Sequence, residues 1–381
     1  MSNLKVYAKT IEDEALEQIN TLLSQDAFKD CKVRIMPDVH AGKGCVIGFT
    51  ADLGNKVIPN IVGVDIGCGM LCVSLGHRDF NAVTLNTLDR VIRTYVPSGK
   101  NVHDGRQMRF EELKELYCYR ELKDTKRLER SIGTLGGGNL GKQVADYYQN
   151  LAYELMCGKD DLYDRQEKLI ADYKAAGRKS EIESAIKELR RNFRAVTPKL
   201  PKDLCYLEGK YREQYLHDMR ICQEFAYMNR VMIAQIICNH MGWGVDADMP
   251  DFFECIHNYI DHDSNIVRKG AISAKYGEKV LIPINMRDGC ILGTGKGNED
   301  WNCSAPHGAG RIMSRMKARE TLNMSDYSNS MDGIYTTSVS EETIDEAPMA
   351  YKPIDEIVEC IGETVDILAI LKPIYNFKAS E

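Results

Sequence analysis

The segment 31–76 reads CKVRIMPDVHAGKGCVIGFTADLGNKVIPNIVGVDIGCGMLCVSLG and alternates short apolar runs with glycine-rich turns. These apolar or β-branched runs, at 31–36, 45–53, 56–64 and 70–75, have the length and composition of strands. We therefore predict four strands joined by loops. Polar residues between the runs are candidate site residues, because loops on a rigid scaffold often carry functional groups.

Helical periodicity surrounds this segment along the rest of the chain. Apolar residues at helical spacing predict helices near 11–24, 105–130, 140–157, 207–239 and 353–364. Strands and turns are predicted for 252–315, and one or two strands for 365–378. The alternation predicts a mixed α/β (α+β) fold, in which one large domain over residues 1–381 has a strand-rich core.

A highly charged stretch over residues 159–203 differs from the rest of this pattern. Its amphipathic part predicts an exposed helical hairpin, a peripheral insertion within the domain. The simplest interpretation of such a charge run is a solvated helical face.

Composition excludes several classes of protein. An apolar fraction of 44% and a charged fraction of 28% are those of a globular chain and not of a disordered one. No apolar run is long enough for a membrane span, and the N-terminus does not resemble a secretory signal. The thirteen cysteines then indicate reduced thiols, so we expect a cytoplasmic protein without membrane contact. With a net charge of −7, nucleic-acid binding would need a local basic patch or metal ions.

Two glycine-flanked segments carry possible metal or phosphate ligands. Asp65 and Cys68 stand in DIGCG, where a carboxylate and a thiolate suit Mn²⁺, Zn²⁺, Fe²⁺ or Co²⁺. A buried, turn-capping Asp with a Cys that packs as a small hydrophobe is the alternative. The glycine run 133–139 ahead of a helix could approach a phosphate, or could be a plain turn. It is not a Walker A loop.

Histidines mark two further candidate segments. His40 lies in the polar loop 36–44, and His257 is followed by Asn258. His307 stands in SAPHGAGR, where small neighbours leave the imidazole open, and where Arg311 and Arg315 could neutralise phosphate. It could attack phosphorus as a nucleophile, or it could be a structural histidine in a tight turn.

Together these segments resemble the RtcB family of RNA-splicing ligases, in the right order and over nearly the whole chain. The matching stretches are MPDVHAGKG (36–44), VGVDIGCGM (62–70), GTLGGGN (133–139), HNYI (257–260), GKGNEDWNCSAPHGAGRIMSR (295–315), EAPMAYK (346–352) and a lysine near the C-terminus. The resemblance implies a GTP- and Mn²⁺-dependent ligase. Such an enzyme joins RNA 3′-phosphate or 2′,3′-cyclic phosphate ends to 5′-hydroxyl ends through a histidine–GMP intermediate, in tRNA splicing and RNA repair.

The resemblance also implies a role for individual residues. His307 matches the histidine that takes up GMP, and Lys378 matches a lysine that recognises guanine. Asp65, Cys68 and His257 match metal ligands in a family that holds two Mn²⁺ ions. The other expected nucleotide contacts are Asn139, His257, Asn258, Pro283, Ile284, Asn285, Met286, Cys290, His307, Gly308, Ala309 and Gly310.

The chain departs from the family pattern at Asn139–Leu140. The family continues GGGN with His-Phe-Ile-Glu, and a second histidine follows in His-Ser-Gly-Ser-Arg, whereas this chain reads GGGNLGKQ. Two metal-ligand histidines, a glutamate and an arginine would be lost with that segment. The three remaining ligands are too few for two ions, so one ion, or weak binding, is expected.

Two alternatives to an active ligase follow from these observations. A degenerate family member would bind nucleotide or RNA ends with impaired catalysis, and retained guanylylation would argue against it. A metal-dependent phosphohydrolase would release phosphate without a covalent protein–nucleotide species. RNA ends and GTP are the expected partners of the ligase, which we expect to be a monomer, with an activating protein partner as an option.

Overall fold

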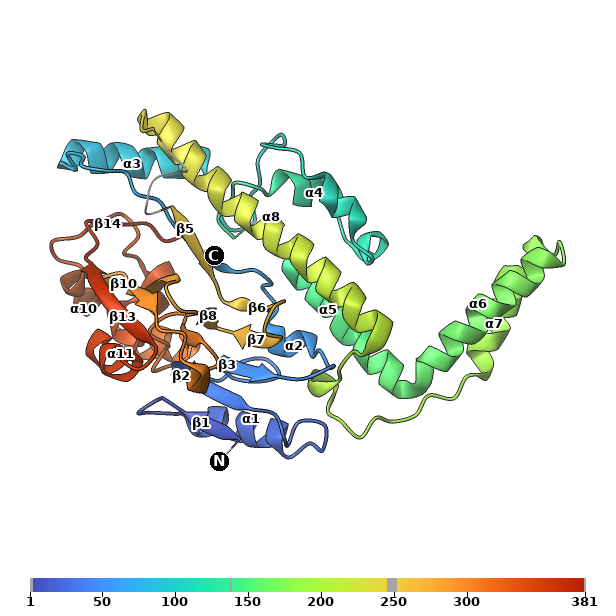
Figure 1. The fold of residues 1–381 in the computed structure, drawn as a ribbon. Coiled ribbons are helices and arrows are strands. Elements are labelled where there is room, and N and C mark those ends of the chain that lie inside the picture. The colour runs from blue at the N-terminus through green and yellow to red at the C-terminus, as the bar shows by residue number, and fades with distance from the viewer. Residues whose placement is uncertain (1–2, 137–138, 245–251, 380–381) are drawn as a thin grey trace.

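A computed structural model of the chain describes residues 3–136, 139–244 and 252–379 (Figure 1). Its largest sheet has five strands in the order β1-β2-β3-β7-β6, with β1 parallel to β2 and the other pairs antiparallel. The N-terminal strands therefore share one sheet with residues 258–269, which lie more than 200 positions further along the chain. The strands are β1 (Leu4–Val6), β2 (Val33–His40), β3 (Ile47–Asp52), β6 (Asn258–Ile260) and β7 (Ile266–Lys269).

Four smaller sheets surround this one. Their strand orders are β4-β5, β11-β8, β13-β10-β9 and β12-β14. The strands are β4 (Gly69–Cys72), β5 (Phe253–Ile256), β8 (Ala271–Ser273), β9 (Lys279–Asn285), β10 (Gly289–Gly295), β11 (Ser304–Pro306), β12 (Tyr335–Thr336), β13 (Val365–Leu371) and β14 (Tyr375–Asn376).

The helices cover the sheets and build the largest apolar core. That core includes buried side chains of α1, the five-stranded sheet, α2, α5 and α8, and a second core lies between β9, β10 and α11. The helices are α1 (Asp13–Leu23), α2 (Pro59–Val62), α3 (Ala82–Tyr95), α4 (Thr125–Arg130), α5 (Leu140–Glu154), α6 (Asp160–Ala175), α7 (Ile182–Asn192), α8 (Gly209–Met241), α9 (Arg315–Thr321), α10 (Met324–Ser330) and α11 (Ile354–Ile361). None of those in the described ranges has the length and apolarity of a membrane-spanning helix.

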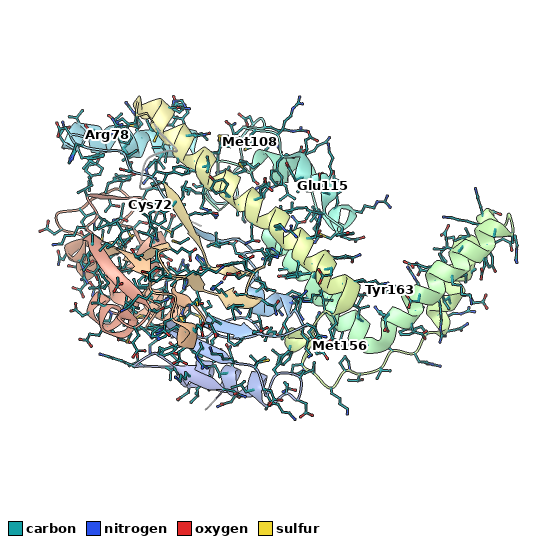
Figure 2. All side chains as sticks on the ribbon, in the orientation of Figure 1. Cys72, Arg78, Met108, Glu115, Met156 and Tyr163 are labelled. Atoms are coloured by element: carbon teal, nitrogen blue, oxygen red, sulfur yellow. The ribbon has the colours of Figure 1, made fainter. Side chains whose placement is uncertain are left out.

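Helices α6 and α7 form an arm that projects away from the body (Figure 1). Met156 and Tyr163 lie at its base, where α5 passes through a π-helical turn over Leu155–Lys159 (Figure 2). No side chain of α7 is buried, so the arm packs mainly against itself. Both helices lie within the charged stretch 159–203.

Most of the predicted elements are present. The strands near 31–36, 45–53 and 70–75 and the helices near 11–24, 140–157, 207–239 and 353–364 correspond to described elements. The strand predicted at 56–64 is wrong, because Pro59 opens the short helix α2, where a missing N–H costs nothing. The helix predicted over 105–130 is largely wrong, since short 3₁₀ turns precede α4.

Candidate active site

His307 follows β11 and is held by a carboxylate from β2. The Oδ2 atom of Asp38 lies 2.6 Å from Nδ1 of His307 and accepts hydrogen bonds from the backbone N–H groups of His307 (3.1 Å) and Gly308 (3.2 Å). Asp38 is fully buried, whereas about a quarter of the His307 side chain is exposed. A hydrogen bond from Nδ1 to the carboxylate leaves Nε2 as the unprotonated nitrogen of a neutral ring.

The backbone around His307 is so closely packed that only small residues fit there. Gly310 has φ +76°, and a Cβ atom there would lie 2.3 Å from the carbonyl oxygen of Asp38. A Cβ on Gly270 would lie 2.1 Å from Cγ2 of Ile47 and 3.2 Å from Cε1 of the His307 ring. Larger residues would displace the histidine or the strand that carries Asp38.

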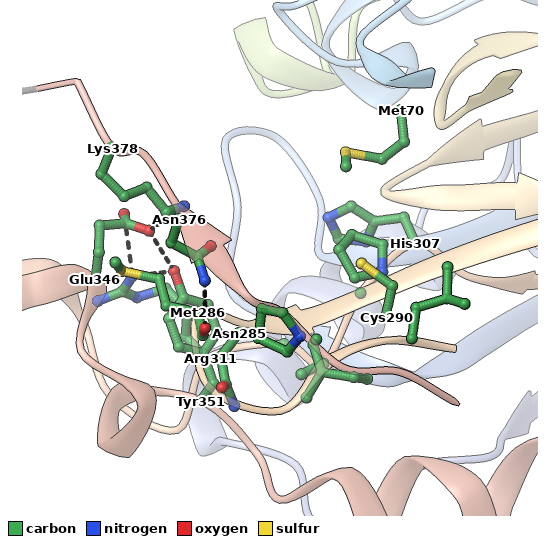
Figure 3. Close-up of a pocket in the computed structure, with 18 of the residues that line it drawn as sticks. Met70, Asn285, Met286, Cys290, His307, Arg311, Glu346, Tyr351, Asn376 and Lys378 are labelled. Atoms are coloured by element: carbon green, nitrogen blue, oxygen red, sulfur yellow. Dashed lines mark hydrogen bonds and ion pairs between the residues drawn. The ribbon is translucent and has the colours of Figure 1, made fainter. Parts of the chain in front are cut away.

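His307 lies in the wall of a cavity of about 630 Å³, within the size range of small-molecule sites. The cavity lies between the β9–β10 turn, the His307 loop and the C-terminal segment (Figure 3). The structure brings together these predicted nucleotide contacts in its lining: Pro283, Ile284, Asn285, Met286, Cys290, His307, Gly308, Ala309, Gly310 and Lys378.

An ion-pair network forms the far end of this cavity (Figure 3). Glu346 accepts hydrogen bonds from Lys378 Nζ (3.1 Å), Tyr351 Oη (2.7 Å) and Arg315 Nη1 (2.6 Å). Burial alone would raise the pKa of Glu346, but Lys378, Tyr351 and Arg315 outweigh it and lower the pKa to about 2. Lys378 is therefore oriented by a fixed negative charge beside the cavity.

The backbone segments that carry the three expected metal ligands meet at the junction of β4, β5 and β6. The His257 N–H donates to the Cys68 carbonyl (2.9 Å), and the Gly67 N–H donates to the Asn258 carbonyl (2.9 Å). Burial raises the pKa of both Asp65 and Cys68, and a hydrogen bond joins the two side chains. The thiol is therefore protonated, and a metal ion would have to displace its proton.

We call the segments that carry Asp65, Cys68 and His257 the metal side of the candidate site. The imidazoles of His257 and His307 link this side to the cavity. Their ring centroids are 4.6 Å apart. Burial lowers the pKa of His257 well below its ordinary value, and the His307 and Arg230 charges add to that shift. The buried Nδ1 atom of His257 has no hydrogen-bond partner in the described part of the chain.

The donor set fits a divalent metal only in part. A thiol, a carboxylate and an imidazole with an unpaired nitrogen have the chemistry for one Mn²⁺ ion. However, the described residues contain no group of three His, Cys, Asp or Glu side chains arranged to hold a metal. Arg230 also donates to the Gly67 carbonyl (2.9 Å), and its positive charge beside these ligands opposes a cation.

Three expected nucleotide contacts, Asn139, His257 and Asn258, lie outside the cavity lining. Asn139 is exposed just before α5, and its Oδ1 accepts a hydrogen bond from Gln143 (2.9 Å). Asn258 donates to the Asp65 carbonyl (3.0 Å) and accepts from the Gly270 N–H (3.0 Å). In this structure Asn258 therefore joins the metal side to β7, and its polar atoms face the backbone.

The sequence alone did not assign a role to Asp38 or Glu346. Asp38 stands in the polar segment 36–44, whose density of polar groups was the available signal. We predicted this segment as a loop, but β2 extends through its first half to His40. Glu346 opens the matched stretch EAPMAYK, but nothing in its neighbours indicates that it pairs with a lysine 32 residues away. His40, the other polar candidate of segment 36–44, also lines the cavity.

Comparison with known proteins identifies the family to which the chain is similar. The family model for the tRNA-splicing ligase RtcB matches residues 21–141 and 135–379. The RNA-splicing ligase RtcB of Escherichia coli K12 is 30% identical over 415 aligned positions, which cover 98% of this chain and 97% of that protein. The tRNA-splicing ligase RtcB of Archaeoglobus fulgidus is 25% identical, with 96% and 91% covered.

The same comparison bears on the junction at Asn139–Leu140. The two family-model matches meet at residues 135–141, around this junction. The alignment with the Escherichia coli protein is longer than the 381 residues of this chain, so that protein has residues without a counterpart here. Matches over nearly the whole length, with this one interruption, show that the chain belongs to the RtcB family of tRNA-splicing ligases.

Proposed function

We propose that this protein is a GTP- and Mn²⁺-dependent RNA ligase that joins 3′-phosphate or 2′,3′-cyclic phosphate ends to 5′-hydroxyl ends. The observation that carries the proposal is the Asp38–His307 pair at the wall of a nucleotide-sized cavity. An imidazole whose Nδ1 is bound to a buried carboxylate is a positioned nucleophile, as in hydrolases where a carboxylate orients the histidine.

His307 would attack the α-phosphorus of GTP through Nε2. The N–P bond forms as the bond from phosphorus to the pyrophosphate oxygen breaks, and pyrophosphate leaves with the electron pair. Asp38 keeps the Nδ1 proton in place and offsets the positive charge on the ring. An oxygen of an RNA 3′-phosphate would then attack the GMP phosphorus, and the N–P bond to His307 would break. The 5′-hydroxyl of the second RNA would attack the activated 3′-phosphate and release GMP. A 2′,3′-cyclic phosphate end would first be opened by water to a 3′-phosphate.

The cavity residues have separate roles in this scheme. Lys378, oriented by Glu346, would donate to the guanine base, while the turn that contains Asn285 and Met286 would hold the nucleotide. Asn376 supports this turn, since its Nδ2 donates to the Met286 carbonyl (2.5 Å). Cys290 and the glycines around His307 leave room for the nucleotide.

Asp65, Cys68 and His257 would hold Mn²⁺. The ion would offset the triphosphate charge and orient the α-phosphate. Because these residues are few and Arg230 lies beside them, we expect at most one weakly held ion per chain.

A degenerate member of the family is the second candidate. It is favoured by the interruption at residues 135–141, where the sequence pattern lacks two histidines. Under this alternative His307 still takes up GMP or binds GTP, while the later ligation steps are impaired.

Two assays separate these candidates. The first incubates the protein with labelled GTP and Mn²⁺ and measures acid-labile, alkali-stable label after denaturation. The second measures joining of RNAs with 2′,3′-cyclic phosphate and 5′-hydroxyl ends. A protein that takes up label from GTP and joins the RNAs supports the active ligase. A protein that takes up label but does not join the RNAs supports the degenerate member. Absence of both activities excludes the proposed chemistry. We further expect a cytoplasmic monomer, whose activating partner would increase both activities.

A further inference from the structure

Residues 190–202 form an exposed segment that carries charge of one sign, which we call the basic strap. It leads from the end of α7 back to the body, and its sequence is RRNFRAVTPKLPK. Five of its thirteen residues are Lys or Arg and none is Asp or Glu, in a chain whose net charge is −7. Between Phe193 and Pro201 the strap has no helix or strand.

The charge composition of the strap differs from that of the helical hairpin beside it. The hairpin carries charges of both signs, and its ion pairs include Arg165 with Asp161 (2.6 Å) and Lys187 with Glu183 (2.7 Å). In the strap, Arg191, Arg194 and Lys199 are exposed and form no ion pair with any described residue. Acidic side chains therefore offset the cations of the hairpin, whereas the strap presents only positive charge to solvent.

The backbone of the strap is also accessible. Between residues 194 and 200, Val196 donates to the Cys157 carbonyl (3.0 Å), and this is the single backbone–backbone hydrogen bond recorded for that stretch in the described structure. The other N–H groups are free to donate to a phosphate or to water. At the base of the strap, Lys202 lies 5.5 Å from the centroid of the half-buried Tyr153 ring. Cations beside accessible aromatic rings are typical of single-stranded nucleic-acid sites.

The end of the strap reaches the loop beside the active site. Asn60 Nδ2 donates to Oδ1 of Asp203 (2.8 Å), and the Asp203 carbonyl lies 3.4 Å from where a Cβ of Gly44 would be. A groove of about 350 Å³ runs between Gly44, Pro201 and α1. A second groove, of about 560 Å³, continues from Gly42 to His40 and Lys317, and His40 also lines the nucleotide cavity.

We propose that the basic strap binds the phosphate backbone of the substrate RNA, outside the ends that are joined. Glu14 lines both grooves, and Glu12, Glu17 and Asp203 each line one of them, so the grooves repel a polyanion, while the strap beside them attracts it. The RNA would therefore follow the strap and not the floor of the grooves. This proposal rests on the proposed function, because the strap would position the RNA strand whose end reaches His307. The strap holds the body of the RNA, and the cavity holds the nucleotide.

The test measures binding of a labelled single-stranded RNA with a 3′-phosphate by fluorescence anisotropy, over a series of KCl concentrations. The test variant is Arg191→Ala/Arg194→Ala/Lys199→Ala in the full chain. The matched control is Lys168→Ala/Lys174→Ala/Lys179→Ala, which removes three exposed charges from the same arm. Three lost phosphate contacts should reduce the slope of log Kd against log [salt] by about 2, and affinity near 0.1 M salt by at least about tenfold.

The control variant should bind RNA within about twofold of the unmodified protein by the same electrostatic argument. Both variants should label His307 normally with GTP, and a trinucleotide too short to reach the strap should bind all three proteins equally. Equal affinity and slope in the strap variant would overturn the proposal, as would an equal loss in both variants. If the strap variant binds RNA normally but loses an acidic protein partner, the strap is a protein-docking surface. Absence of label in every protein would instead refute the proposed function.

Discussion

On the side of the candidate site where we propose that the nucleotide binds, the β9–β10 turn, the His307 loop and Lys378 line one cavity, and both His307 and Lys378 have a carboxylate partner. On the side where we propose that a metal binds, Asp65 and Cys68 are joined by a hydrogen bond, and Nδ1 of the buried His257 has no partner in the described structure. The two sides meet at the imidazoles of His257 and His307, whose ring centroids are 4.6 Å apart. From this contrast we expect nucleotide binding in the cavity to be better preserved in this chain than metal binding.

The largest effect is expected at His307. His307→Ala should remove all covalent label from GTP, because no other imidazole in the described structure has a buried carboxylate on Nδ1 and an open ring face in the cavity. His262→Ala, which changes an exposed histidine, should label normally. Label that persists in His307→Ala would show that the nucleotide side has been misassigned.

Asp38→Asn tests whether the carboxylate positions the nucleophile. The amide has the same volume but no charge to stabilise a cationic ring, so the rate of labelling should fall by about 10²-fold. Asp263→Asn, on an exposed loop, is the control. An unchanged rate would reduce Asp38 to a structural role.

Cys68→Ser examines the metal side. Serine is a poor ligand in place of a thiolate, so Mn²⁺ affinity measured by calorimetric titration should fall by at least about tenfold. The melting temperature should stay close to that of Cys360→Ser, a half-buried cysteine in α11. Two tight Mn²⁺ sites in the unmodified protein would contradict the contrast between the two sides, as would a normal affinity in Cys68→Ser.

Lys378→Ala should weaken GTP binding without removing the nucleophile. Loss of one charged hydrogen bond, worth about 1.5 kcal/mol, predicts a roughly tenfold higher GTP concentration for half-maximal labelling. Labelling at saturating GTP should remain close to normal, and Lys114→Ala, far from the cavity lining, should behave as the unmodified protein. A lower plateau with unchanged half-saturation would place Lys378 in the chemical step.

The smallest effect concerns the pH dependence of stability through Glu346. Its pKa is about 2 in the folded chain and 4.5 in the unfolded chain, so its stabilisation is present above pH 4.5 and is lost as pH falls toward 2. Between about pH 5 and 3 the unmodified protein should lose roughly 1 kcal/mol more than Glu346→Gln. Urea unfolding of both proteins at the two pH values measures this difference. Equal losses of unfolding free energy in the two proteins would refute the stabilising role of the Glu346 ion-pair network.

The sequence by itself determined the element types wherever a long periodic pattern was present. The spacing of apolar residues predicts α5, α8 and α11, because burial of one face at a 3.6-residue period decides such helices locally. It failed for α2, where Pro59 stands in a short apolar run, and for 105–130, where the 3₁₀ turns follow tertiary packing. Family membership also followed from the sequence, since the matching stretches are local.

The tertiary structure alone decided which groups face each other. Asp38 and His307 are 269 residues apart, and Glu346 and Lys378 are 32 apart; no local pattern encodes either pair. The same holds for the basic strap, whose charges are visible in the sequence but whose lack of partners depends on where α6 and α7 lie. Composition and periodicity report the local preference of each residue for burial, helix or strand. Hydrogen bonds and ion pairs depend on atoms placed within about 3 Å, and those positions are set by the packing of the whole chain.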